Sequence, residues 1–210
     1  LICSAYDFND IPEGWKVDNE GPVQTGYTEG NEEYFIERDI SGMRIVQAPV
    51  GYSNQYTVEV DVHWVDVGYE YGLIFGQRGN ADSLTYRFGV DTTNRKYRLR
   101  IGSTESDDWD CVGKQSDPYC WNELDSDTEV YPSGSSNRLT VNCTGLGISV
   151  YINPEENPTA LWHDSGHNCR GKVGVFAQSI TQDPNALAYF DNFRVDCLSS
   201  SVVALYTTNG

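Results

Sequence analysis

Three polar side chains at alternate positions are the first candidates for chemistry in this chain of 210 residues. Glu59, Asp61 and His63 share one face if residues 56–64 form a strand, because side chains of a strand alternate between two faces. Retaining hydrolysis of a glycosidic bond needs two carboxyl groups about 5 Å apart. An exposed polar strand face explains the same residues equally well, and we do not expect an enzyme.

A second candidate site lies in residues 104–136, a long acidic segment that breaks the rhythm of the neighbouring strands. Loops of this length are usually functional or disordered. Three aromatic residues of the segment, Trp109, Tyr119 and Trp121, could stack on sugar rings beside the carboxylates. Packing of these rings against a local disulfide is the alternative. Tyr69 and Tyr71 are the next candidates for ligand binding.

Six cysteines indicate a disulfide framework and an oxidising, extracellular compartment, since none of them belongs to a CxxC pair. Six cysteines allow 15 connectivities, and the spacing suggests one of them: Cys3 with Cys197, Cys111 with Cys120, and Cys143 with Cys169. Asn142 begins the chain's single N-glycosylation sequon, and we do not expect it to be modified.

The charge balance excludes two classes of partner. The net charge of −17 argues against nucleic acids and anionic membranes. No stretch reaches the roughly 18 apolar residues of a membrane helix. An acidic surface suits a secreted or cell-surface protein, and it suits Ca²⁺, which prefers carboxylate and carbonyl oxygens.

The fold class follows from alternation with period two. In residues 56–64 the even positions carry Tyr, three Val and Trp, whereas the odd positions are polar. The same pattern predicts strands at residues 34–38, 43–47, 71–77, 84–90, 96–101, 138–142, 148–152, 172–177 and 188–195. Close spacing and turn signals between them predict an all-β antiparallel β-sandwich, and no segment shows a helical pattern.

Short motifs add a family resemblance. They read YDFND at residues 6–10, EYGLIF at 70–75, NRLTVNC at 137–143, GKVGVF at 171–176 and YFDNFRV at 189–195. In this order they resemble the strands of laminin-G-like and concanavalin A-like jelly rolls of secreted bacterial proteins, including those related to 3-keto-disaccharide hydrolases. The resemblance implies a concanavalin A-like jelly roll whose first and last strands pair, which supports the Cys3–Cys197 bridge.

The resemblance also implies two sites. Related endo-glucanases carry Glu-x-Asp-x-x-Glu on their catalytic strand, but Trp64 stands here in place of the second Glu. Related glucanases often hold a structural Ca²⁺ with an Asp of the final strand, which corresponds to Asp191, and Asp7 or Asn9 could supply a neighbouring oxygen. The alternative is that Asp191 only forms hydrogen bonds to the first strand.

Residues 1–198 form one predicted domain, and residues 199–210 form a tail with a strand-like segment at 202–207. This segment could add to the sheet of a neighbouring copy. We therefore predict a non-catalytic structural or adhesive subunit that assembles with itself outside the cell. The alternative is a lectin-like module that binds an extracellular glycan; a glycoside hydrolase is the third option.

Overall fold

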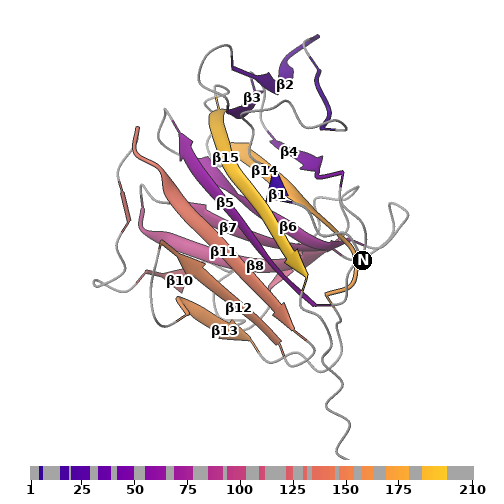
Figure 1. Ribbon diagram of the computed structural model, residues 1–210. Helices are drawn as coiled ribbons and strands as arrows, with labels where there is room; N and C mark the ends of the chain where they lie inside the picture. Colours follow the sequence, from indigo (N-terminus) through magenta and orange to yellow (C-terminus); the bar gives the residue numbers. More distant parts are fainter. Residues whose placement is uncertain are drawn as a thin grey trace, which may run out of the picture.

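The computed structural model gives the chain as a two-layered β-sandwich (Figure 1). The structure describes residues 5–6, 15–18, 20–28, 33–38, 42–49, 55–64, 69–77, 85–91, 94–102, 109–111, 122–124, 130–131, 134–144, 147–153, 158–162, 169–179 and 186–197. No helix occurs in these ranges, and hence none that could cross a membrane.

Sheet A is the front layer of Figure 1 and contains the first and last described strands. Its strands are hydrogen-bonded in the order β13-β12-β11-β5-β15-β3-β2, and β1 also pairs with β15. The strands are β1 (Ala5–Tyr6), β2 (Val23–Tyr27), β3 (Tyr34–Arg38), β5 (Tyr56–Trp64), β11 (Asn137–Thr144), β12 (Gly147–Ile152), β13 (Ala160–Trp162) and β15 (Ala186–Cys197). All pairs in the sheet are antiparallel.

Sheet B lies behind sheet A and is also antiparallel. Its order is β10-β8-β7-β6-β14-β4, with β9 also paired to β8. The strands are β4 (Gly42–Gln47), β6 (Tyr69–Gln77), β7 (Thr85–Asp91), β8 (Lys96–Gly102), β9 (Trp109–Cys111), β10 (Asn122–Glu123) and β14 (Lys172–Ser179).

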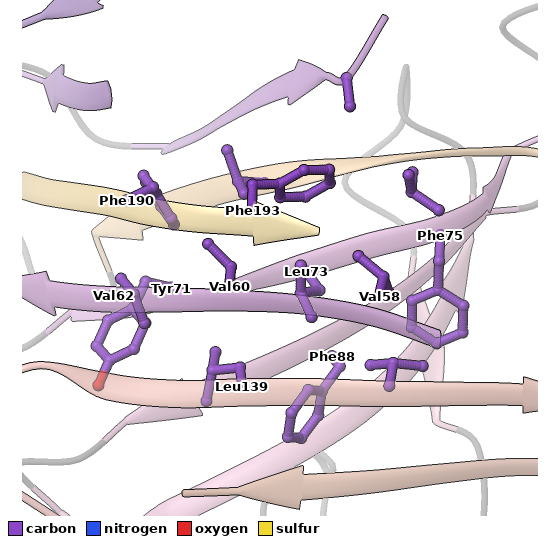
Figure 2. Close-up of a cluster of buried hydrophobic side chains, with 14 of the residues drawn as sticks. Val58, Val60, Val62, Tyr71, Leu73, Phe75, Phe88, Leu139, Phe190 and Phe193 are labelled. Carbon is purple, nitrogen blue, oxygen red and sulfur yellow. The ribbon is translucent and has the colours of Figure 1, made fainter. Parts of the chain in front are cut away.

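The core lies between the two sheets, where alternate residues of each strand meet (Figure 2). Val58, Val60 and Val62 of β5 are fully buried and face the side of sheet B that carries Leu73 and Phe88. Burying one such side chain stabilises the fold by about 1.5–3 kcal/mol. The alternation is thus confirmed over residues 56–63, whose side chains the structure describes, and it leaves Glu59, Asp61 and His63 on the outer face of sheet A.

All ten predicted strands are present, with ends that differ by at most two residues. The sequence missed β2 and β13, and it missed β9 and β10 inside the acidic segment 104–136. These strands are short, and β2 contains Gly26 in place of an apolar residue. Short elements without alternation carry too little pattern for detection.

The expected pairing of the first and last strands is confirmed, because Ala5 lies opposite Arg194 and Tyr6 opposite Phe193. Cys197 at the end of β15 is disulfide-bonded. Cys3 and Cys120 lie outside the described residues, as does the side chain of Cys111. The Cys3–Cys197 and Cys111–Cys120 pairings therefore stay predictions.

The Cys143–Cys169 disulfide is confirmed and joins β11 to the segment before β14, with a Cα–Cα distance of 5.7 Å. Both residues are buried. The bridge closes a loop of 26 residues in the unfolded chain, so loop-closure entropy assigns it about 3 kcal/mol. We expect the double variant Cys143→Ala, Cys169→Ala to lose about that much free energy of unfolding and so to unfold at a lower urea concentration. An unchanged urea midpoint would contradict the entropic account.

Candidate functional site on the outer face of sheet A

A row of aromatic side chains crosses the outer face of sheet A. His63 of β5 lies opposite Tyr189 of β15, and Tyr189 lies opposite Phe35 of β3. The three are half-buried, whereas their chain neighbours Val62, Ile36 and Phe190 point into the core. The rings of His63 and Tyr189 are stacked, with centroids 4.8 Å apart and an interplanar angle of 19°.

A row of polar groups runs beside these rings. Asp61 lies directly opposite Asp191, which places their Cβ atoms about 4.5–5.5 Å apart. Arg138 of β11 binds Asp61 through two hydrogen bonds of 2.7 Å, from Nε to Oδ1 and from Nη2 to Oδ2. Glu33, just before β3, lies 3.2 Å from His63 Nδ1. The face thus offers several oxygen acceptors next to exposed ring surface.

Asn192 fixes the two aspartates relative to each other. Its side-chain Nδ2 donates to Asp61 Oδ2 at 2.9 Å and to Asp191 Oδ2 at 3.2 Å, and its backbone N–H donates to Asp191 Oδ1 at 2.7 Å. Asn192 has a φ of 51° at a β-bulge between Asp191 and Arg194. Asn tolerates this left-handed conformation better than most residues, so the bulge aims one amide at both carboxylates.

Electrostatics on this face reflect partial burial. Burial raises the pKa of Glu33 above its usual range and repulsion from Asp191 adds to the shift, against the attraction of His63. Burial also raises the pKa of Tyr189, together with the charges of Glu33 and Glu37. The hydrogen bond to Asp61 raises the pKa of Arg138, which stays charged. The Tyr189 hydroxyl therefore remains a donor at neutral pH.

Asp61 of the hydrolase-like pattern of β5, and Asp191 opposite it, are held by neighbouring side chains. Asp61 accepts three hydrogen bonds, and both oxygens of Asp191 accept hydrogen bonds from Asn192. Glu59, which we considered with Asp61 and His63, lies opposite Thr140 on one side and Arg194 on the other. Carboxylates held in this way are suited to orienting a polar ligand.

Of the sequence-predicted aromatic site in the acidic segment, the structure describes the backbone of Trp109, which lies at the edge of sheet B. Trp109 begins β9 and pairs with Gly102, and Trp121 directly precedes β10. The side chain of Trp109 and all of Tyr119 and Trp121 lie outside the described residues, so sugar binding by them stays a prediction. Tyr71 faces the core and is 1% exposed, so it is not a surface ligand-binding residue.

The calcium hypothesis involves residues that the structure describes only in part. Asp7 and Asn9 lie outside the described ranges, while Asp191 is hydrogen-bonded to Asn192 of its own strand. No group of three or more potential ligands that could hold a metal ion occurs among the described residues. Binding of Ca²⁺ by Asp191 with Asp7 or Asn9 stays a prediction.

Asn142 lies in β11 on the outer face of sheet A. Its side-chain oxygen accepts a hydrogen bond from Thr57 of the neighbouring strand. That the sequon is not modified stays a prediction.

A buried ionic cluster on the outer face of sheet B was missed from the sequence. Glu70 of β6 is fully buried and accepts hydrogen bonds from Arg98 of β8 and Arg87 of β7. The distances are 3.0 Å from Arg98 Nε to Oε1 and 3.3 Å from Arg87 Nη2 to Oε2. Arg87 also lies over the ring of Phe176, 5.1 Å from its centroid. Burial of this cluster indicates a role in stability.

No protein-family model matches the chain, and no curated protein sequence matches it. Solved structures do match. The carbohydrate-binding module CBM66 from Bacillus subtilis superposes with a TM-score of 0.61 at 15% identity, over 87% of this chain and 95% of that one. A Bacillus subtilis protein of unknown function with a galectin-like fold gives 0.61 at 12% identity, over 87% and 89% of the two chains.

The fold is a concanavalin A-like jelly roll. The chain also matches part of a larger protein, the GH43 protein BlXynB from Bacillus licheniformis, with a TM-score of 0.61 at 13% identity. That match covers 92% of this chain but 39% of the other. At these identities the likeness shows the jelly roll alone, since one such scaffold hosts many functions.

Proposed function

We propose that this chain is a non-catalytic carbohydrate-binding module that holds a glycan on the outer face of sheet A. The observation that carries the proposal is the half-buried row of His63, Tyr189 and Phe35 beside Asp61 and Asp191. Sugar rings have an apolar face that stacks on aromatic rings and hydroxyls that donate to carboxylates. The match to a carbohydrate-binding module supports the same function at the level of the fold.

The preferred ligand is a neutral glycan of a secreted or cell-surface environment. Carboxylates outnumber cations on this face: Glu33, Glu37, Glu59, Asp61, Asp191 and Asp196 against Arg138 and Arg194. Both arginines are paired with aspartates of the same face. A polysaccharide of uronic acids or sulfate esters would be repelled by this surface. The disulfide Cys143–Cys169 is compatible with an extracellular location.

Replacing Tyr189 by Ala tests the site. We expect the dissociation constant for a neutral glycan selected on a glycan array to rise about tenfold, equivalent to about 1.4 kcal/mol. The control is Tyr131→Ala, which removes an exposed tyrosine outside the sheets. Calorimetry should show weakened binding for the first variant alone.

A second pair of variants separates the two candidate glycan sites. Trp109→Ala and Trp121→Ala should leave binding unchanged if the outer face of sheet A holds the ligand. Loss of binding in these variants, with full binding in Tyr189→Ala, would assign the ligand to the acidic segment instead.

The assembly hypothesis depends on residues 202–207, which lie outside the described ranges.

A further inference from the structure

Met43 of β4 takes part in a side-chain contact that joins distant strands of sheet B. Arg87 of β7 donates a hydrogen bond from Nη1 to Met43 Sδ, at a distance of 2.8 Å. In the order of the sheet, β6 and β14 lie between these two strands. The Arg87 guanidinium passes over the ring of Phe176 of β14, 5.1 Å from its centroid. Arg87 thus extends across the outer face of sheet B and reaches a sulfur atom.

Sulfur is a poor hydrogen-bond partner for a buried charge. Arg87 is 1% exposed, and its Nη2 donates to Glu70 Oε2 at 3.3 Å. A thioether sulfur is only a weak acceptor, whereas hydrogen bonds from a guanidinium group to oxygen are among the strongest in proteins. The Nη1 group is therefore bonded less strongly to Met43 than it would be to an oxygen at the same place.

We propose that Met43 is an oxidation site, at which a peroxide converts the thioether to a sulfoxide whose oxygen accepts the hydrogen bond of Arg87. A lone pair of Sδ attacks one oxygen of hydrogen peroxide, so that an S–O bond forms and the O–O bond breaks. The sulfur loses two electrons, and the second oxygen takes the proton of the first and leaves as water. Met43 is half-buried, so part of its surface is open to a molecule of this size.

The guanidinium group changes the expected effect of oxidation on stability. Oxidation of methionine ordinarily disturbs packing, because it makes an apolar side chain polar. At Met43 the new oxygen faces Arg87, and a hydrogen bond to a charged group contributes more than one between neutral groups. The flexible methionine side chain allows the sulfur to withdraw by the length of the new bond. The new hydrogen bond should therefore offset the cost of the added polar group.

Treatment of the full chain with hydrogen peroxide tests the proposal. Met43 is the single methionine of the sequence, so peptide mass spectrometry assigns a sulfoxide without ambiguity. We expect Met43 to be oxidised in the folded protein, and the oxidised protein to unfold in urea at or above the midpoint of the unmodified protein. Met43→Leu, treated in the same way, is the control for oxidation of other residues, and its midpoint should not change on treatment.

Two substitutions isolate the contribution of the oxygen. Glutamine resembles methionine sulfoxide in length and offers an oxygen acceptor, whereas leucine offers none. We expect the folding equilibrium constant of Met43→Gln to exceed that of Met43→Leu about tenfold, as for one hydrogen bond to a charged group. The matched control is Leu187→Gln, at a half-buried position of sheet A, which should not stabilise the protein.

Three results would overturn the proposal. The first is a folded protein whose Met43 stays unmodified under peroxide treatment that oxidises it in the urea-unfolded chain. The second is an oxidised protein that unfolds at a lower urea concentration than the unmodified protein. The third is a Met43→Gln variant no more stable than Met43→Leu, because the oxygen then gains nothing from Arg87. No glycan enters these measurements, so this proposal and the glycan-binding proposal fail independently.

Discussion

Replacing Glu70 by Gln should lower the free energy of unfolding by about 3–5 kcal/mol, the usual cost of removing one partner from a buried ion pair. Glu70 is 0% exposed and lies between Arg87 and Arg98, which are themselves 1% and 4% exposed. Glutamine keeps the size of the side chain but removes the carboxylate charge that faces two buried guanidinium groups. Urea unfolding at neutral pH measures the loss as a lower midpoint.

The same cluster predicts how the loss depends on pH. Burial by itself raises the pKa of Glu70, but Arg87 and Arg98 outweigh it and hold that pKa below its usual value. A carboxyl group with a depressed pKa stabilises the fold above its unfolded pKa, near 4.3, and loses this contribution as the pH falls through the folded value. The difference in free energy of unfolding between Glu70→Gln and the unmodified chain should therefore become smaller below about pH 4.

Glu59→Gln is the matched control for both measurements. Glu59 lies half-exposed on the outer face of sheet A, where solvent screens its charge. Its replacement should change the free energy of unfolding by at most about 0.5 kcal/mol. Equal losses in the two variants would mean that the Glu70 cluster is no more important to stability than a surface carboxylate.

The strand pattern could be predicted because the long strands of sheet A, such as β5 and β11, face solvent on one side and the core on the other. In β5 the valines at positions 58, 60 and 62 alternate with Glu59 and Asp61, and the structure keeps that division. The antiparallel pairing of β1 with β15 followed from the family resemblance and is also confirmed. The local alternation and the topology implied by the family resemblance were together sufficient to predict the fold.

The sites depend on register between strands distant in sequence, which a single sequence does not contain. His63 meets Tyr189 because β5 pairs with β15 in one register and shifts at Asn192. No local sequence pattern predicts that an asparagine at a bulge forms hydrogen bonds to both Asp61 and Asp191. Likewise, Glu70 alternates with buried Tyr71 as a surface residue would, yet both are buried.

Replacing Gly89 by Ala should destabilise the protein by about 3 kcal/mol, a large effect for one added methyl group, at the upper end of overpacking costs. Gly89 of β7 lies opposite Arg98 of β8. A Cβ atom at position 89 would lie 1.8 Å from Glu70 Oε1 and 2.5 Å from Glu70 Cδ. A flexible side chain could move away, but Arg87 and Arg98 hold this carboxylate in place. The methyl group must therefore displace the ion pair or bend the strand.

A double-mutant cycle separates that contact from a general intolerance of β7. In a Glu70→Ala background the carboxylate is gone, so Gly89→Ala should cost less than about 1 kcal/mol and the coupling should reach about 2 kcal/mol. Gly174→Ala is the matched control, since its Cβ atom would lie 2.1 Å from the backbone oxygen of Val46, which Glu70→Ala does not move. Its cost should be the same in both backgrounds. If Gly89→Ala also costs the same in both, the Glu70 carboxylate is not what keeps position 89 a glycine.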